Sequence, residues 1–250
     1  MKLRPRQDTK LRSPQLLDKA AELAKYIQSL SATELAKAMQ ISPVLGQKTA
    51  AQFADWSSDP NQQSCALDTF VGDMYSGLQF ASFTSADRAY ADTSLRILSG
   101  LYGVIRPLDG IMPYRLEMAY RLPSSTFGNL YNFWGDTVAK TLPSAGPIIN
   151  ASSVEYTRLV TPFVDQARII TPQFLTISQK TGEPTFVVVH AKIARGAFAH
   201  WLITQRIESV SSLPDFNELG YSYSAELSRR DAPAYVAREF GGLGLSVRLT

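Results

Sequence analysis

Helix start signals fill the first third of the chain, and strand patterns begin only near residue 147. A serine-proline pair at residues 13–14 opens a helix that we predict over about residues 14–29. A capping box at residues 31–34 and a second serine-proline pair at residues 42–43 open two further helices, and a fourth is predicted over residues 86–98. The apolar face of the first helix consists of Leu16, Ala20, Leu23, Ile27 and Leu30.

Short strand patterns follow in the second half of the chain. Residues 148–149 and 168–170 each contain a pair of isoleucines, which are apolar and β-branched, and each segment is predicted to be a short strand. Residues 174–178 and 185–190 are also predicted strands, and the glycine-containing turn between them indicates a hairpin.

Helical spacing returns over residues 191–207. Its predicted inward residues are Ile193, Ala197, Trp201 and Thr204, and its predicted outward residues are Lys192, Arg195 and Arg206. Helices and strands therefore mix without a regular alternation, which favours the α+β class over a doubly wound sheet. Because no repeat or linker divides the chain, we expect a single compact domain over residues 1–250.

The overall charge gives no argument for a polyanionic partner. The chain has 25 lysines and arginines against 22 acidic residues, a net charge of +3 on 250 residues. Residues 1–12 are basic and contain too few apolar side chains to pack, so we expect them to be poorly ordered. Any case for a nucleic-acid partner must come from where the charges lie.

Cys65 is the only cysteine, so no intrachain disulfide can form. A cysteine between small residues is more often a core residue than a redox sensor. The chain has no signal-peptide pattern and no uninterrupted apolar stretch of about 18 residues. We therefore expect a cytoplasmic protein with no membrane partner.

Gly100 and Gly103 lie three residues apart, directly after the predicted helix 86–98. Such a turn can direct backbone amides at a phosphate, and its pattern is also that of helix-hairpin-helix modules, which grip the DNA backbone without reading sequence. The alternative is a helix C-cap and tight turn packed on the core. The motif alone leaves both interpretations open.

Between Lys48 and Lys140 every basic residue is an arginine. Arginine suits bidentate phosphate contacts, and we select Arg106 and Arg115 as nucleic-acid ligands. Their alternative role is ion pairing with neighbouring carboxylates, Asp109 and Glu117.

Lys192 and Arg195 are a second pair of cations, three residues apart at the predicted beginning of a helix. There they would share a face next to the positive end of the helix dipole and attract anions. The alternative is an ordinary solvated helix end.

Four carboxylates lie beside glycine, aromatic or arginine residues and are our candidates for acid–base chemistry: Asp73, Glu117, Asp136 and Glu155. No phosphate-binding loop, dinucleotide motif or zinc motif is present, so we expect no cofactor and no metal site. His190 and His200 are the only histidines, and neither is assigned a catalytic role. The carboxylates show no compact ligand spacing, which gives little support to direct iron binding.

Taken together, the motifs resemble those of the bacterial YaaA family of peroxide-stress proteins. Residues 98–118 resemble the family's LSGLYG-x-LRPLD-x-x-x-PYRLEM block almost residue for residue. Other blocks, in the family's order, are residues 72–78 (GD-x-Y-x-GL), 133–136 (FWGD), 153–156 (S-x-EY), 191–196 (AK-x-ARG) and 220–221 (GY).

The resemblance implies a compact α+β fold with a helix-hairpin-helix-like element and a positively charged cleft. It implies binding of double-stranded or structured DNA through its backbone, with little sequence preference. It also implies a role in resistance to hydrogen peroxide, by limiting the damage done by unincorporated iron. It implies no particular catalytic reaction.

Two departures from the family pattern concern the expected cleft. Residues 1–9 lack the short apolar strand that leads into an SPAKT sequence, which indicates either a start placed too far downstream or a shortened variant. Val71 stands where the family usually has a lysine. If the cleft needs both lysines, this chain binds DNA weakly or not at all.

Two functions are compatible with these residues. In a DNA-binding protein, phosphates would be bound by Gly100, Gly103, Arg106, Arg115, Lys192 and Arg195. In an enzyme that acts on a nucleotide or a nucleic-acid base, the four carboxylates would act beside stacking side chains, namely Tyr75, Tyr114 and Trp134.

Overall fold

The computed structural model describes residue 1 and residues 11–247, so most of the basic segment 1–12 lies outside the described residues. The chain divides into two compact units, each assembled from separate segments. Unit 1 consists of Met1–Phe70, Leu95–Pro143 and Ser153–Val164, and unit 2 consists of Val71–Ser94, Ser144–Ser152 and Asp165–Thr250. The single domain that we expected from the absence of a linker stays a prediction.

Unit 1 is mainly helical, with two small antiparallel sheets in which β1 pairs with β4 and β2 with β3. Its helices are α1 (Leu17–Gln28), α2 (Ala32–Met39), α3 (Pro43–Ala54), α4 (Ala66–Thr69), α7 (Leu130–Trp134) and α8 (Val154–Thr157). Its strands are β1 (Ser64–Cys65), β2 (Ile97–Ser99), β3 (Gly103–Ile105) and β4 (Gly110–Ile111).

Unit 2 is built around one helix and a four-stranded sheet of order β8-β7-β10-β9. Its helices are α5 (Asp73–Leu78), α6 (Ser85–Ser94) and α9 (Val188–Thr204). Its strands are β5 (Ile148–Ile149), β6 (Ile169–Ile170), β7 (Gln173–Ile177), β8 (Pro184–Thr185), β9 (Tyr221–Arg229) and β10 (Ala232–Ala237). None of the described helices is both long and apolar enough to pass through a membrane.

The start signals read from the sequence place the second and third helices correctly. Ser31 and Glu34 form both hydrogen bonds of the capping box at the start of α2, and the Ser42 side chain accepts from the Leu45 amide at the start of α3. The first helix begins at Leu17, three residues after the proline that we took as its first residue. The mixture of helices and small sheets confirms the α+β class.

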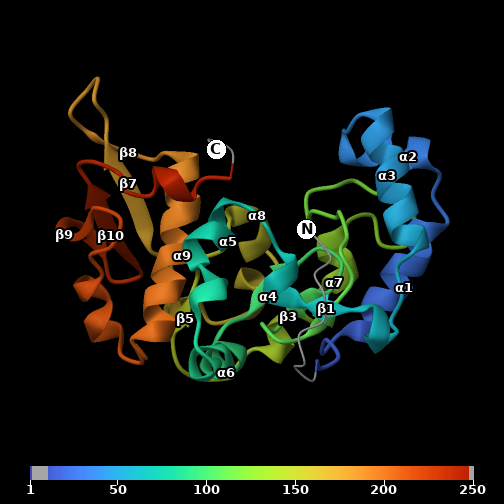
Figure 1. Ribbon diagram of the computed structural model, residues 1–250, viewed down its shortest axis with the longest axis horizontal. Helices are drawn as coiled ribbons and strands as arrows, with labels where there is room; N and C mark the ends of the chain where they lie inside the picture. Colours follow the sequence, from blue (N-terminus) through green and yellow to red (C-terminus); the bar gives the residue numbers. More distant parts are fainter. Residues whose placement is uncertain (2–10, 248–250) are drawn as a thin grey trace. The chain divides into compact units, whose positions relative to one another are not determined.

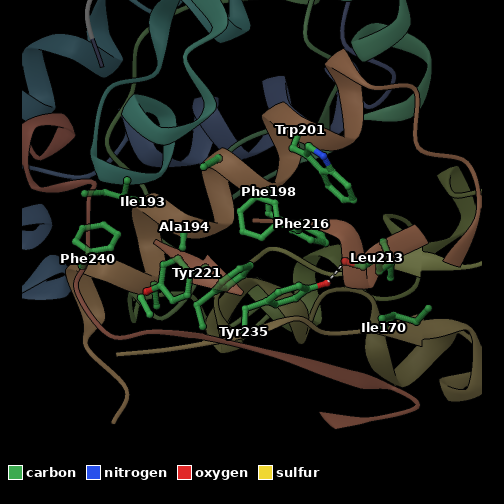
Figure 2. Close-up of a cluster of buried hydrophobic side chains, with 14 residues drawn as sticks. Ile170, Ile193, Ala194, Phe198, Trp201, Leu213, Phe216, Tyr221, Tyr235 and Phe240 are labelled. Carbon is green, nitrogen blue, oxygen red and sulfur yellow. Dashed lines mark hydrogen bonds between the residues drawn. The ribbon is translucent and has the colours of Figure 1, made fainter. Parts of the chain in front are cut away.

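The core of unit 2 lies between α9 and the sheet, where α9 (orange) packs against the strands (Figure 1). Phe174 of β7 contacts four aromatic rings, and its ring stacks on Tyr235 of β10 at 5.3 Å. Figure 2 shows Phe198 and Trp201 of α9 in the same cluster. The Tyr235 hydroxyl donates to the Leu213 carbonyl at 2.6 Å, so its polar end is satisfied within the core.

Glycines allow α5 and α9 to cross with their backbones in contact. A Cβ on Gly77 would lie 2.1 Å from the Ile193 carbonyl oxygen, and a Cβ on Gly196 would lie 2.0 Å from the Met74 carbonyl oxygen. Any larger residue at either position would force the two helices apart. The crossing therefore joins two of the sequence blocks, residues 72–78 and 191–196, in one rigid contact.

Two predicted elements differ from the structure. The helix over residues 86–98 ends at Ser94, because Ile97 and Leu98 pair with Ile105 and Val104 in a β-hairpin. The strand over residues 185–190 is limited to Pro184–Thr185, and α9 begins at Val188. A short apolar run cannot be assigned to a strand or a helix by its spacing alone, which explains the second error.

Adding a methyl group at Gly196 tests the helix crossing. We expect Gly196→Ala to lower the free energy of unfolding by about 1–3 kcal/mol, because overpacking displaces α5 from α9. Gly244→Ala is the control, since a Cβ there meets nothing within 4 Å. Urea unfolding measures both variants, and equal effects would show that the crossing does not require glycine.

Candidate functional site

The predicted phosphate-binding turn is a tight turn between two strands, β2 and β3. Gly100 and Gly103 are both buried. A Cβ on Gly100 would lie 2.4 Å from the Leu116 carbonyl oxygen, and a Cβ on Gly103, whose φ is +68°, would lie 2.8 Å from the Trp134 ring. The packing alternative therefore accounts for both glycines, and no helix-hairpin-helix element is present at this turn. Phosphate binding by their amides stays a prediction that the burial disfavours.

A buried polar network fixes this turn to the following loop. The Ser99 hydroxyl accepts from the Tyr102 amide at 2.9 Å and lies 2.6 Å from the Tyr114 hydroxyl. The Tyr102 hydroxyl accepts from the Trp56 indole at 2.9 Å and from the Met112 amide at 3.0 Å. Tyr114 and Trp134, which we took as stacking side chains, are buried parts of the core. The loop that carries Arg106 and Arg115 is thus held at both ends.

Arg106 does not form the ion pair that was its alternative role. Its backbone amide donates to Asp109 Oδ2 at 2.8 Å, but no ion pair joins its guanidinium to a carboxylate within the described residues. Its Nε is buried without a hydrogen-bond partner. Burial raises the pKa of Asp109 despite the nearby Arg12, Arg106 and Arg96. The Arg106 guanidinium therefore retains donors for another acceptor.

Arg115 has only a neutral partner in the described part of the chain. Its Nη2 donates to the Tyr120 hydroxyl at 3.1 Å, and its Nε is buried without a hydrogen-bond partner. Glu117, its predicted ion-pair partner, is exposed and forms no ion pair with it. Burial, followed by the charge of Glu117, raises the pKa of the Tyr120 hydroxyl.

Glu155 lies close to Tyr120 and Arg115, and it joins three segments of unit 1. Its Oε1 accepts from the Ala119 amide at 2.9 Å, and its carbonyl accepts from the Tyr131 hydroxyl at 3.1 Å. Its charge also raises the pKa of Tyr120. The structure therefore brings together Arg115, Glu117 and Glu155, and it adds Tyr120 and Tyr131. Neither tyrosine is among the site residues selected from the sequence.

The other two carboxylates have partners elsewhere, one distant in the sequence and one local. Asp73 is 4% exposed, and its Oδ1 accepts from the Ser246 hydroxyl at 3.3 Å and from the Val247 amide at 3.2 Å. Asp136 pairs with Lys140 at 2.8 Å, one turn along the chain. Across residues 11–247 no three histidine, cysteine or acidic side chains gather in a way that could hold a metal ion.

Lys192 and Arg195 lie on one face of α9 but not at its first turn. The helix begins at Val188, earlier than predicted, so both residues are too far from its end to benefit from the dipole. Arg195 is half-buried, its Nε has no hydrogen-bond partner, and burial lowers its pKa. Val71, which replaces the family's lysine, is 42% exposed.

The four predicted cations are divided between the units. Arg106 and Arg115 belong to unit 1, and Lys192 and Arg195 belong to unit 2. Their convergence on one basic cleft stays a prediction.

The two histidines have structural contacts in unit 2. His190 Nδ1 lies 3.0 Å from Thr176 Oγ1, and its ring stacks on Phe240 at 4.1 Å. His200 Nδ1 donates to the Leu78 carbonyl at 2.9 Å, which fixes α9 to the end of α5. Both contacts are those of packing residues.

Cys65 is half-buried and donates a hydrogen bond from Sγ to the Pro107 carbonyl at 3.2 Å. Burial raises the pKa of the thiol to about 11, with a further contribution from the charge of Asp68. At neutral pH the group is therefore a thiol, which is the unreactive form.

Comparison with known proteins gives one family. A family model described as peroxide stress protein YaaA matches residues 1–227. A UPF0246 protein of Salinispora tropica is 55% identical over 248 residues, which are 99% of this chain and 94% of that protein. UPF0246 proteins of Idiomarina loihiensis and Marinomonas sp. are 40% and 36% identical, covering 86% and 90% of this chain and 86% and 88% of their own lengths.

The state of Cys65 predicts slow alkylation. At pH 7.5 we expect iodoacetamide to react with the folded protein about a hundredfold more slowly than with the urea-unfolded chain, whose thiol has an ordinary pKa near 8.5. The folded rate should still be rising above pH 9, because the thiol pKa is about 11. Mass spectrometry measures both rates. A folded rate that levels off near pH 8.5 would contradict this assignment and return Cys65 to consideration as a peroxide sensor.

Proposed function

The chain belongs to the peroxide stress protein YaaA family, and from this membership we propose that it acts in the response to hydrogen peroxide by binding DNA. In this proposal it contacts the backbone of double-stranded or structured DNA, with little sequence preference. Occupying the DNA in this way limits the damage caused there by unincorporated iron. Arg106, Arg115, Lys192 and Arg195 are the phosphate ligands.

One observation carries the proposal. Arg106, Arg115 and Arg195 are half-buried residues, yet none forms an ion pair with a carboxylate in the described residues, and each has a buried Nε without a hydrogen-bond partner. Most partly buried arginines are neutralised by an acidic neighbour, because an uncompensated charge is costly to bury. An anionic ligand supplies the missing charge, and a phosphate fits the fork of the guanidinium.

The same observation limits the kind of recognition. Arginine side chains that are held in place by packing bind phosphates and set the position of the protein on DNA. Sequence, in contrast, is read at the edges of the bases. The buried turn at Gly100 and Gly103 is left out of this interface. Binding is therefore expected to be dominated by counterion release and to depend steeply on salt.

Arg115→Ala tests the proposal. Each phosphate contact contributes about −0.9 to the slope of log K against log salt concentration, so we expect the variant to reduce the magnitude of that slope by about one unit. Fluorescence anisotropy with a labelled duplex measures the slope. Arg229→Ala is the control, because that side chain is 76% exposed and lies 3.7 Å from Asp231, outside the proposed interface. A folded Arg115→Ala protein with the wild-type slope would remove Arg115 from the interface.

A second candidate function is chemistry on a nucleotide or a nucleic-acid base in unit 1. The observation that favours it is the placement of Glu117 and Glu155 beside Tyr120 and Arg115, since a passive phosphate binder has no need of carboxylates. Because one Glu155 oxygen accepts from the Ala119 amide, the exposed Glu117 is the better acid–base candidate.

Glu117→Gln tests this second function. This function predicts that wild-type protein incubated with oligonucleotides that carry damaged bases gives product and that the variant gives none, because the amide cannot transfer the proton. Chromatography of the digested oligonucleotides detects the product. Tight binding without product in the wild type would exclude the enzyme for those substrates.

A further inference from the structure

We infer that Glu155 is a positioning residue, which holds the loop carrying Arg115 in the orientation needed to bind a DNA phosphate. This inference rests on the proposed function. It replaces the catalytic role considered for Glu155 with a structural connection between its carboxylate and Arg115.

The connection runs through consecutive hydrogen bonds. Glu155 Oε1 accepts from the Ala119 amide at 2.9 Å. Ala119 precedes Tyr120, whose own amide donates to the Glu117 carbonyl at 3.2 Å and closes a turn. The Tyr120 hydroxyl then accepts from Arg115 Nη2 at 3.1 Å. The position of the guanidinium is therefore tied to the Glu155 carboxylate through the turn.

Glu155 is itself fixed from two directions. The Tyr131 hydroxyl, on α7, donates to its carbonyl at 3.1 Å. The helix α8 has only four residues and continues into Leu159 and Val160, which are 1% and 6% exposed. Such a short helix is not stable alone, so the buried residues after it and the tyrosine before it hold it in place. A rigid support of this kind reduces the conformational entropy that Arg115 loses on binding.

Electrostatics makes the role testable, because charge and position predict opposite results. If Glu155 acted on DNA only through its negative charge, its removal would strengthen binding to a polyanion. If it positions Arg115, its removal weakens binding and flattens the salt dependence. Glutamine keeps an acceptor for the Ala119 amide and loses the charge, so Glu155→Gln separates the two roles.

The experiment compares four full-length variants with the wild type by anisotropy, using one labelled duplex over a range of salt concentrations. We expect Glu155→Ala to reduce the magnitude of the salt slope by about one unit, as Arg115→Ala does. Glu155→Gln should keep the wild-type slope. Glu22→Ala is the matched control, because it removes an exposed carboxylate from the same unit and changes the net charge equally.

Two further measurements complete the test. The double variant Glu155→Ala/Arg115→Ala should show no additional flattening, since both changes remove one contact. Hydrogen exchange at the Ala119 amide should accelerate in Glu155→Ala and remain slow in Glu155→Gln. This measurement reports the hydrogen bond between residues 119 and 155 in the absence of DNA.

The outcomes separate the inference from the function on which it rests. A wild type that does not bind the duplex overturns the proposed function and, with it, the positioning role. A wild type that binds, with a slope flattened by Arg115→Ala and not by Glu155→Ala, overturns the inference alone. Equal flattening by Glu155→Gln and Glu155→Ala, with Ala119 still protected in the glutamine variant, also overturns it, because the slope would then fall although the hydrogen bond to Ala119 is kept.

Discussion

Close approach of backbone at glycine is the constraint on which both units depend. In unit 2, Gly77 and Gly196 let α5 and α9 cross closely, because a Cβ at either glycine would lie about 2 Å from a backbone carbonyl oxygen of the other helix. In unit 1, Gly103 lies under the Trp134 ring, and Trp134 Nε1 donates to the Gly100 carbonyl at 3.0 Å. Four of the six family blocks therefore pack in two pairs, and the glycines at these contacts serve packing.

These contacts also determine where the charged side chains stand. Arg195 is next to Gly196, so the helix crossing fixes its place on α9. Arg115 follows the loop held by the Tyr114 hydroxyl contact and is joined through Tyr120 to the segment that Glu155 secures. Arginines without acidic partners on such a frame are prepared to bind an anion with little further ordering.

Helix starts that depend on neighbouring residues could be predicted from the sequence, whereas contacts between distant segments could not. The capping box at Ser31 identified α2 because both of its hydrogen bonds are made within one turn. The strand assigned to residues 185–190 was wrong, because Val188 and its neighbours enter α9, and this removed the dipole argument for Lys192. The role of Glu155 depends on a backbone amide 36 residues away, for which side-chain patterns carry no signal.

The central claim is that the arginines without acidic partners receive DNA phosphates. Side-chain Nε–H resonances of arginine, followed by NMR during titration with a short duplex, test this claim most directly. The account predicts that the signals of Arg106, Arg115 and Arg195 shift along one binding curve, while that of Arg229 stays in place. Shifts confined to other arginines, with these three unchanged at saturation, would contradict it.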